Sequence, residues 1–419
     1  MQLNDNTRRI TAQDVLTEIV NLKQVIFEVT DDCNLSCKYC IYGGFYGGFD
    51  HRESNRMDFN DAKAVIDYLC GVWRESVSLA NNSITYIGFY GGEPLLNFPF
   101  IRQIVEYVES LNVPRRFRFA MTSNCLLLDR YMDYLAEKEF YLLCSLDGDK
   151  IGNGYRVRKD GTSSFDKVFS NIKLLQSKHP EYFLKFVSFN TVLHNLNSVQ
   201  DTNAFIQREF GKTSRFSELS PVGVLPEKLE DFKNAFREVV ENIHQSENYD
   251  SLCDELGVSN PEAQQIIRYI EAYEENIYDS YLDLFVEEQQ RKTIPSGTCI
   301  PFNKKMFVKV DGKIMQCEQI PHKFALGFVR DGKVNIDLDR IAGDFNSSLD
   351  RIQALCRTCY RRNMCPKCLY QIEMTDNTFK KCDYHMNKGE YERYRKEFLK
   401  YMHDHPGTYR LAMFNSMTV

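Results

Sequence analysis

The sequence predicts an α/β fold built on a parallel sheet, and two observations support this prediction. Short runs rich in β-branched and apolar residues alternate with helix-length amphipathic segments, and such alternation requires parallel strands joined by right-handed crossovers. Polar residues follow successive predicted strands, as they do at the mouth of a barrel, where α/β folds place their chemistry. With 419 residues the chain is long enough for two or three domains.

The expected elements follow one another along the chain. Residues 11–22 are expected to form a short helical or extended lead-in, and helices are expected at residues 60–73, 99–111, 129–138, 165–178 and 388–403. Strands are expected at residues 25–29, 83–90, 116–122, 141–145 and 185–193, with an Asp-Gly hairpin at 306–315. Asn60 or Asp61 is the expected N-cap of the second helix. Residues 226–292 carry charged residues at helical spacing, which predicts two or three amphipathic helices.

The composition is that of an ordinary soluble protein, with 43% hydrophobic and 26% charged residues. The net charge of -6 gives no electrostatic footprint for nucleic acid. Residues 1–22 mix charge throughout, so no secretory signal is expected, and no apolar run approaches the roughly 20 residues of a membrane span. These observations predict a cytoplasmic protein without nucleic-acid or membrane partners.

The fourteen cysteines fall into three groups. Three lie between residues 33 and 40 and seven between residues 299 and 382. Without an export signal they are not expected to form a disulfide framework, because the cytosol keeps thiols reduced. The remaining four stand singly among apolar neighbours and are predicted to be buried, unpaired thiols: Cys70, Cys125, Cys144 and Cys253.

The first cysteine group directly follows the strand expected at 25–29. Cys33, Cys37 and Cys40 are four and three residues apart, and Tyr39 stands before the last. Thiolates on a short loop suit an iron–sulfur cluster, and three ligands leave one iron open for chemistry. The alternative, a structural zinc knot, would need a fourth ligand, for which His51 is the nearest candidate.

A second motif, Gly91-Gly92-Glu93-Pro94, follows the strand expected at 83–90. Two glycines let a backbone carbonyl approach a ligand closely, and Glu93 and Pro94 make the turn rigid. Together with the cysteine loop, this motif resembles the signature of the radical S-adenosylmethionine (SAM) enzymes. The resemblance implies a partial (β/α)6 barrel and a [4Fe–4S] cluster whose free iron chelates SAM. It also implies that SAM is reduced to a 5′-deoxyadenosyl radical, and that the glycine-rich motif binds the SAM amine.

The resemblance extends to later strand ends. It implies that Ser123 and Asn124 lie near the SAM ribose and carboxylate, and that Ser145 and Asp147 lie near substrate or cofactor, with Asp147 a candidate catalytic residue. Arg156 is the candidate partner of the SAM carboxylate, because a planar guanidinium suits that group. The alternative for each of these residues is a solvated loop or a helix cap.

The second cysteine group also indicates metal. Seven cysteines are too many for one tetrahedral zinc site and one short of two four-cysteine sites. The pattern resembles the SPASM domain, a C-terminal extension of radical SAM maturases that carries two auxiliary [4Fe–4S] clusters. By this resemblance one cluster is held by Cys356, Cys359, Cys365 and Cys382, and the other by Cys299, Cys317 and Cys368. Glu318 follows Cys317 at a position where some relatives carry a general base.

Two departures from the SPASM pattern bear on function. One cysteine is missing between Cys299 and Cys317, and only two residues separate Cys365 from Cys368. The missing cysteine implies an open iron, which could bind and deprotonate a substrate thiol. The alternative is that Glu318 or water fills this position.

These patterns predict an oxidoreductase, a radical SAM/SPASM maturase of a ribosomally synthesised precursor peptide (RiPP). The favoured product is a thioether between a cysteine sulfur and a carbon of another residue. The alternatives are carbon–carbon or ether crosslinking, formylglycine formation in a sulfatase and, outside enzymes, an iron–sulfur electron carrier or a zinc scaffold. The expected partners are the peptide and a reductant such as flavodoxin or ferredoxin.

The chain is expected to divide into five parts. These are a lead-in at 1–22, the barrel at 23–225, a helical bridge at 226–295, the SPASM domain at 296–385 and a helical tail at 386–419. Because the lead-in is too short for a peptide-recognition domain, we expect the barrel, the bridge or a separate protein to bind the leader of the peptide.

Overall fold

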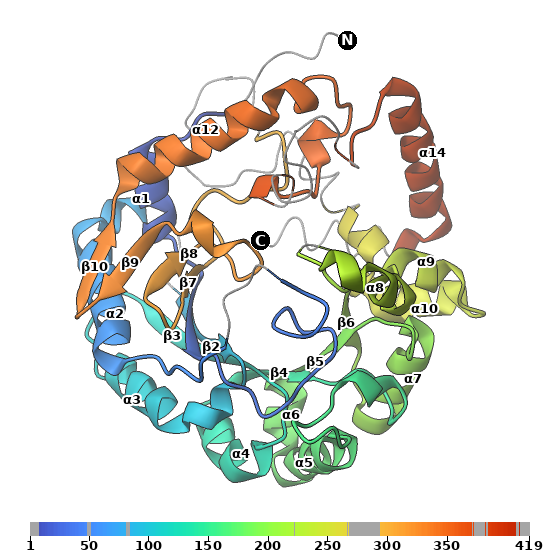
Figure 1. The fold of residues 1–419 in the computed structure, drawn as a ribbon, viewed down its shortest axis with the longest axis horizontal. Coiled ribbons are helices and arrows are strands. Elements are labelled where there is room, and N and C mark those ends of the chain that lie inside the picture. The colour runs from blue at the N-terminus through green and yellow to red at the C-terminus, as the bar shows by residue number, and fades with distance from the viewer. Residues whose placement is uncertain are drawn as a thin grey trace. The chain divides into compact units, whose positions relative to one another are not determined.

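The computed structural model describes residues 8–47, 52–80, 84–221, 223–265, 267, 294–370, 372, 382, 384–407 and 410. The chain divides into two compact units (Figure 1). The larger unit comprises Thr17–Asn242 and Phe302–Asp337, and the smaller unit comprises Met1–Leu16, Ile243–Pro301 and Leu338–Val419.

The larger unit is built on a sheet that, in its described residues, has ten strands in the order β10-β9-β8-β7-β1-β2-β3-β4-β5-β6. The six strands that come first in the sequence, β1 to β6, run parallel to one another. They are β1 Gln24–Thr30, β2 Ile84–Gly91, β3 Arg116–Ser123, β4 Tyr141–Ser145, β5 Val187–Val192 and β6 Ser214–Ser217. The predicted α/β fold with a parallel sheet is therefore confirmed. The sheet remains open, because strand order ends at β6 on one side and β10 on the other.

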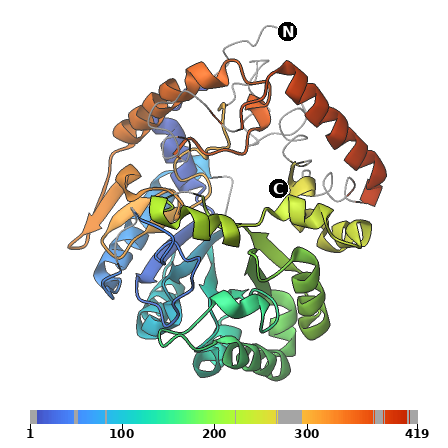
Figure 2. The same cartoon turned by 45° about the vertical axis from the view of Figure 1, so that its right-hand side comes forward.

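Helices connect these strands and cover the outer face of the sheet in both views (Figures 1 and 2). They are α2 Phe59–Glu75, α3 Phe98–Glu109, α4 Leu128–Glu137, α5 Phe165–Lys178, α6 Pro180–Phe186 and α7 Val199–Phe210. The rings of Phe27 on β1 and Phe100 on α3 meet edge to face at 6.3 Å. Because side chains alternate along a strand, the neighbours of Phe27, among them Glu28, face the barrel interior.

Two local predictions were wrong. The N-cap of α2 is Asp58, whose Oδ1 accepts hydrogen bonds from the backbone N–H groups of Asn60 and Asp61 at 2.8 and 3.1 Å. The strand expected at 185–193 begins at Val187 instead, because Pro180 opens the short helix α6 and fixes a helical φ at its first position.

The predicted hairpin is confirmed as β7 Met306–Val308 and β8 Lys313–Met315. Gly312 adopts φ +83°, which the turn requires. β7 pairs in parallel with β1, and β9 Gly327–Arg330 and β10 Lys333–Ile336 extend the sheet by antiparallel pairing (Figure 1). This part of the chain, assigned from sequence to the cysteine-rich domain, thus continues the barrel sheet.

The regular elements described in the smaller unit are helices. They include α10 Tyr249–Leu256, α12 Leu338–Cys356 and α14 Lys388–Asp404. The predicted helix at 388–403 is confirmed, and a capping box between Asn387 and Glu390 begins it. Helices α8 Leu229–Ala235, α9 Val239–His244 and α10 occupy the start of the predicted bridge, whereas residues 268–293 and the end of the tail lie outside the described residues.

The four single cysteines are buried, as predicted: Cys70, Cys125, Cys144 and Cys253. Among the described residues, no helix combines the length and the apolar character that crossing a bilayer would require.

Candidate active site

The loop that carries Cys33, Cys37 and Cys40 leaves the carboxyl end of β1. The Asp32 carboxylate accepts a hydrogen bond from the Cys33 backbone N–H at 2.8 Å. Farther along, the N–H groups of Ser36 and Lys38 donate to the carbonyls of Val157 and Tyr155, at 2.8 and 3.2 Å. The cysteine loop is therefore held along its length by a second segment, residues 155–158, which follows β4.

The three thiols of this loop lie close together. Burial and the proximity of Cys40 raise the pKa of Cys33, and the same two causes raise the pKa of Cys37 to about 12. Bringing such thiols to the thiolate form requires nearby positive charge, which the irons of a cluster provide. Thiol proximity and ionisation chemistry therefore fit a cluster held by Cys33, Cys37 and Cys40.

Donors around these thiols also suit cluster ligands. The Asn124 side-chain amide donates to Cys33 Sγ at 3.7 Å, and one Arg52 guanidinium N–H donates to Cys40 Sγ at 3.3 Å. Hydrogen bonds to ligand sulfurs are among the features that set cluster potentials. Within the described residues no three His, Cys, Asp or Glu side chains are arranged to hold a single metal ion. A cubane, by contrast, distributes its thiolates over different irons.

The glycine-rich motif lies against the cysteine loop. A Cβ on Gly92 would come within 1.9 Å of the Asp32 carbonyl, and one on Gly91, at φ +125°, within 2.3 Å of the Thr30 carbonyl. The Glu93 N–H donates to the Asp32 carbonyl at 2.9 Å. The two glycines thus allow the ends of β1 and β2 to meet, a reason for glycine that the sequence did not reveal.

The carboxyl group of Glu93 joins the ends of β2 and β3, and the residue is only 1% exposed. Its oxygens accept hydrogen bonds from Ser123 Oγ and the Asn124 N–H, both at 2.8 Å, and from the Leu95 N–H at 3.2 Å. All three donors are neutral, and burial raises the pKa of Glu93 to about 7. The structure therefore brings the predicted residues Glu93, Ser123 and Asn124 together beside Cys33.

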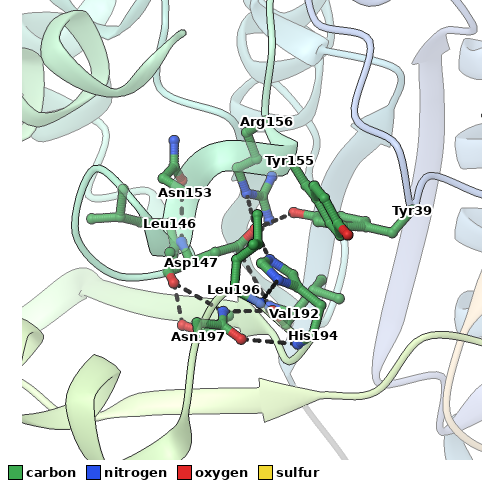
Figure 3. A network of polar contacts seen from close by, with 12 residues as sticks. Tyr39, Leu146, Asp147, Asn153, Tyr155, Arg156, Val192, His194, Leu196 and Asn197 are labelled. Atoms are coloured by element: carbon green, nitrogen blue, oxygen red, sulfur yellow. Dashed lines mark hydrogen bonds and ion pairs between the residues drawn. The ribbon is translucent and has the colours of Figure 1, made fainter. Parts of the chain in front are cut away.

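A second buried carboxylate, Asp147, lies at the end of β4 (Figure 3). It accepts hydrogen bonds from Arg156 Nε at 2.9 Å and Nη2 at 3.0 Å, from the Val192 N–H at 3.0 Å, and from the Tyr39 hydroxyl. Burial alone would raise the pKa of Asp147, but the Arg156 guanidinium and these hydrogen bonds outweigh it and lower the pKa.

This network bears on the roles that were predicted for Asp147 and Arg156. Asp147 is fully enclosed and its oxygens are occupied, so it is placed to orient its neighbours. Arg156 is also buried and gives two of its N–H groups to Asp147, so a contact with the SAM carboxylate would have to use the others. Ser145 is buried at the end of β4, beside Asn190 on β5.

Three buried or half-buried residues of this region were missed from the sequence: Glu28, Arg52 and His194. Glu28 accepts hydrogen bonds from the Val310 N–H at 3.0 Å and the Tyr42 hydroxyl at 3.5 Å, and burial raises its pKa. No spacing motif marks any of them. An ionisable residue inside an apolar strand, as Glu28 is in β1, was the one available signal.

Cys317 follows β8, and the Gln319 N–H donates to its sulfur at 3.4 Å. The neighbouring Glu318 is half-buried and pairs with Lys305, whose Nζ lies 3.0 Å from each carboxylate oxygen. Glu318 is therefore held in one orientation by an ion pair in the larger unit.

The smaller unit gathers four other cysteines. Burial, together with the proximity of three further thiols, raises the pKa of Cys356 to about 12; these thiols belong to Cys359, Cys365 and Cys382. Nearby, the Gly297 N–H donates to the Lys367 carbonyl at 2.9 Å, and the Leu369 N–H donates to Thr298 Oγ1 at 2.7 Å. The segments that carry Cys299 and Cys368 therefore run side by side.

Comparisons with known proteins agree with this geometry. A family model described as the Radical SAM superfamily matches residues 27–208. An uncharacterized protein of Methanocaldococcus jannaschii, MJ0907, is 31% identical over 177 residues, 42% of this chain and 54% of that protein. The radical SAM cyclopropyl synthase TigE of Paramaledivibacter caminithermalis is 23% identical over 207 residues, 49% of this chain and 41% of the synthase.

A further relative is a cysteine-type anaerobic sulfatase-maturating enzyme of Clostridium novyi, 27% identical over 179 residues, 42% of this chain and 46% of that enzyme. The chain thus spans about half the length of these curated relatives. Among solved structures, anSMEcpe with bound AdoMet and a peptide superposes with a TM-score of 0.59 and 18% identity, over 94% of this chain and 99% of that one. Residues 27–208 of this chain are therefore similar to the Radical SAM superfamily, and the curated relatives that match this part of the chain include enzymes.

Proposed function

We propose that this protein is a peptide maturase that cleaves SAM reductively at the Cys33, Cys37 and Cys40 loop. A [4Fe–4S] cluster held there would supply the electron that converts SAM into methionine and a 5′-deoxyadenosyl radical. The observation that carries this proposal is the clustering of the cysteine loop with Gly91–Pro94, Ser123 and Asn124 at adjacent strand ends. The radical would form at the barrel mouth, where substrate can enter.

We further propose two auxiliary [4Fe–4S] clusters. The mutual proximity of four thiols supports the closed cluster of Cys356, Cys359, Cys365 and Cys382. The paired segments around Thr298 and Leu369 support the placement of Cys299 and Cys368 on the other. The assignment of Cys317 to that cluster rests on the cysteine pattern of the sequence alone. One iron of that cluster would then have no cysteine ligand, and a substrate thiolate could bind to it.

The proposed product is a thioether in a ribosomally synthesised peptide. Hydrogen abstraction would leave a carbon radical, and attack by the peptide cysteine sulfur would form the C–S bond. The thiol proton would pass to a base, for which Glu318 beside Lys305 is the candidate. The remaining electron would pass to an auxiliary cluster. The peptide therefore loses two hydrogens, and the SAM-derived radical gains one.

Formylglycine formation in a sulfatase is the second candidate. The similarity to the sulfatase-maturating enzyme of Clostridium novyi and the likeness in fold to anSMEcpe favour it. The missing cysteine before Cys317 and the shortened spacing between Cys365 and Cys368 favour the thioether. We propose a cytoplasmic location, with flavodoxin or ferredoxin as the electron donor.

The proposal is tested by anaerobic incubation of reconstituted protein with SAM and dithionite. Wild type should release 5′-deoxyadenosine, and Cys33→Ala, Cys37→Ala and Cys40→Ala should not. The matched control is Cys253→Ala, a buried cysteine outside the site, which should retain the activity. Absence of 5′-deoxyadenosine from wild type with intact clusters would contradict the proposal.

The two candidate products are separated with two synthetic peptides. One is a precursor peptide that contains a cysteine, and the other is a sulfatase peptide with its target cysteine. Loss of two hydrogens together with loss of the free thiol, in the first peptide alone, supports the thioether. Conversion of cysteine to an aldehyde in the second would establish formylglycine formation instead.

A further inference from the structure

Tyr39, directly before the third cysteine of the loop, is held at several points (Figure 3). Its hydroxyl donates to Asp147, and its ring lies 5.7 Å from the His194 ring and 5.4 Å from the Arg156 guanidinium. Its ring also packs against an apolar cluster formed by Tyr46, Leu219, Phe232 and Ala235. Tyr39 is therefore held both by the hydrogen bond of its hydroxyl and by the packing of its ring.

His194 is the least explained member of this group. It is fully buried, and its Nδ1 accepts a hydrogen bond from the Leu196 N–H at 3.2 Å. A neutral imidazole that accepts at Nδ1 carries its hydrogen on Nε2. Nε2 lies 3.8 Å from Asp147 Oδ2 and has no hydrogen-bond partner within the described structure. The donor thus faces Asp147 at a distance longer than a hydrogen bond.

The position of Asp147 is itself fixed by backbone contacts. Its N–H donates to Asn153 Oδ1 at 3.2 Å, and its carbonyl accepts from Asn197 Nδ2 at 2.9 Å. Asn197 Nδ2 also donates to the Val192 carbonyl at 3.0 Å, so the ends of β4 and β5 are tied together. Asp147 is therefore a rigid anchor to which neighbouring side chains attach.

The same anchor fixes the backbone of the cysteine loop. Arg156 is bound to Asp147 through its side chain, and the flanking residues Tyr155 and Val157 accept the N–H groups of Lys38 and Ser36. The His194 ring lies 4.5 Å from the ring of Tyr155. Residues 36–39 are thus positioned from one side by Asp147, Arg156 and His194 together.

We propose that Asp147 and His194 are positioning residues for the cysteine loop, acting through Tyr39 to set where Cys40 and Cys37 present their sulfurs. His194 does so by holding the Tyr39 and Tyr155 rings and by directing its Nε2 hydrogen toward Asp147. This inference rests on the proposed function, since its readout is the cluster that the loop would hold. Residues that orient metal ligands typically affect metal affinity or activity by about 10–100-fold.

The test compares variants of Tyr39 and His194 that differ in the polar groups they retain. Tyr39→Phe removes only the hydroxyl, His194→Phe removes both ring nitrogens, and His194→Gln retains a donor. The matched control is Tyr107→Phe, which removes a tyrosine hydroxyl bonded to Asp67 on the helical surface. Each reconstituted protein is reduced, and its electron paramagnetic resonance spectrum is recorded during a titration with SAM.

We expect Tyr39→Phe and His194→Phe to alter the SAM-dependent spectrum and to weaken SAM binding about tenfold. His194→Gln should recover most of the loss, and Tyr107→Phe should match wild type. Tyr39→Phe combined with Asp147→Asn should be no worse than Asp147→Asn alone, because both remove the same contact.

Two results would overturn the inference. If the spectra and SAM affinities of Tyr39→Phe and His194→Phe match wild type, while only the melting temperature falls, these residues merely fill the core. If wild type itself shows no SAM-dependent signal, the proposed function fails, and the inference fails with it. Wild type and variants thus report on the two claims separately, and Tyr39→Phe is mild enough to keep the test valid should His194→Phe not fold.

Discussion

Glu93 and Asp147 are both buried carboxyl groups at strand ends next to the cysteine loop, yet their pKa values shift in opposite directions. Glu93, after β2, accepts hydrogen bonds from three neutral donors, and burial raises its pKa to about 7. Asp147, after β4, accepts two hydrogen bonds from the Arg156 guanidinium, and its pKa is lowered despite equal burial.

The difference shows that burial alone does not decide which carboxylate stays ionised: the Arg156 counter-charge is the largest cause that lowers the pKa of Asp147. Asp147 keeps its charge near neutral pH because Arg156 is buried with it. Glu93 takes up a proton close to neutrality because no cation donates to it in the described structure. The contacts of Asp147 after β4 therefore do not change near neutral pH, whereas those of Glu93 after β2 depend on pH.

The largest expected effect comes from breaking the ion pair at Asp147. Asp147→Asn leaves the Arg156 guanidinium buried without its counter-charge, and such losses cost about 3–5 kcal/mol. We expect the free energy of unfolding of the apo protein, measured in urea, to fall by that amount. The control is Asp166→Asn, which breaks the exposed Lys150–Asp166 pair and should cost less than about 1 kcal/mol. Equal losses in the two variants would contradict the comparison.

The second prediction concerns pH and Glu93. Its pKa is raised from 4.5 to about 7 in the folded state, so the folded protein binds this proton more tightly than the unfolded chain. The stability it contributes is present below pH 4.5 and is lost as the pH rises to about 7. The loss is about 3 kcal/mol, at about 1.4 kcal/mol for each pKa unit.

Urea unfolding between pH 4.5 and 7.5 measures this effect as the difference between wild type and Glu93→Gln. The variant removes the titrating group, so its stability should fall less steeply over this range. Parallel curves for the two proteins would show that Glu93 does not titrate there. They would remove the distinction between the two strand ends.

The third prediction separates charge from geometry at Asp147. Arg156→Lys keeps a cation beside the carboxylate but loses the paired N–H geometry, and hydrogen bonds to charged groups contribute about 1.5–3 kcal/mol. We expect a stability loss in that range and less than that of Asp147→Asn. A loss as large as that of Asp147→Asn would show that geometry, and not charge, sustains the network.

The smallest effect is expected at the surface of the same loop. Lys159 pairs with Asp32 at 2.8 Å, but its side chain is 62% exposed. Such pairs contribute less than about 1 kcal/mol and are screened by salt. Lys159→Gln should therefore leave the urea midpoint nearly unchanged. A loss of several kcal/mol would show that this pair holds the cysteine loop more firmly than the buried contacts do.

Local patterns in the sequence predicted most of the parallel strands and the loop of Cys33, because strand periodicity and cysteine spacing lie within a few residues. The partners of the site could not be predicted in this way. Tyr39 donates a hydrogen bond to Asp147, which is 108 positions away in the sequence, and Ser123 donates one to Glu93, which is 30 positions away. Only the folded sheet brings such residues to one edge.

Two misses have simple physical reasons. His194 stands alone after a strand, and nothing about a single histidine indicates that Tyr39 and Tyr155 will enclose it. The N-cap was misplaced because Asp58, Asn60 and Asp61 all have suitable side chains, and the choice among them depends on where the backbone leaves its extended conformation.

The central claim is tested most directly by the iron and sulfide content of anaerobically reconstituted protein, with wild type beside the combined Cys33→Ala, Cys37→Ala and Cys40→Ala variant. The account predicts about twelve irons per chain in wild type and about eight in the variant, for three [4Fe–4S] clusters of which one is lost. About four irons in wild type, with zinc at the remaining cysteines, would contradict it. The auxiliary clusters and the thioether mechanism would then have to be abandoned.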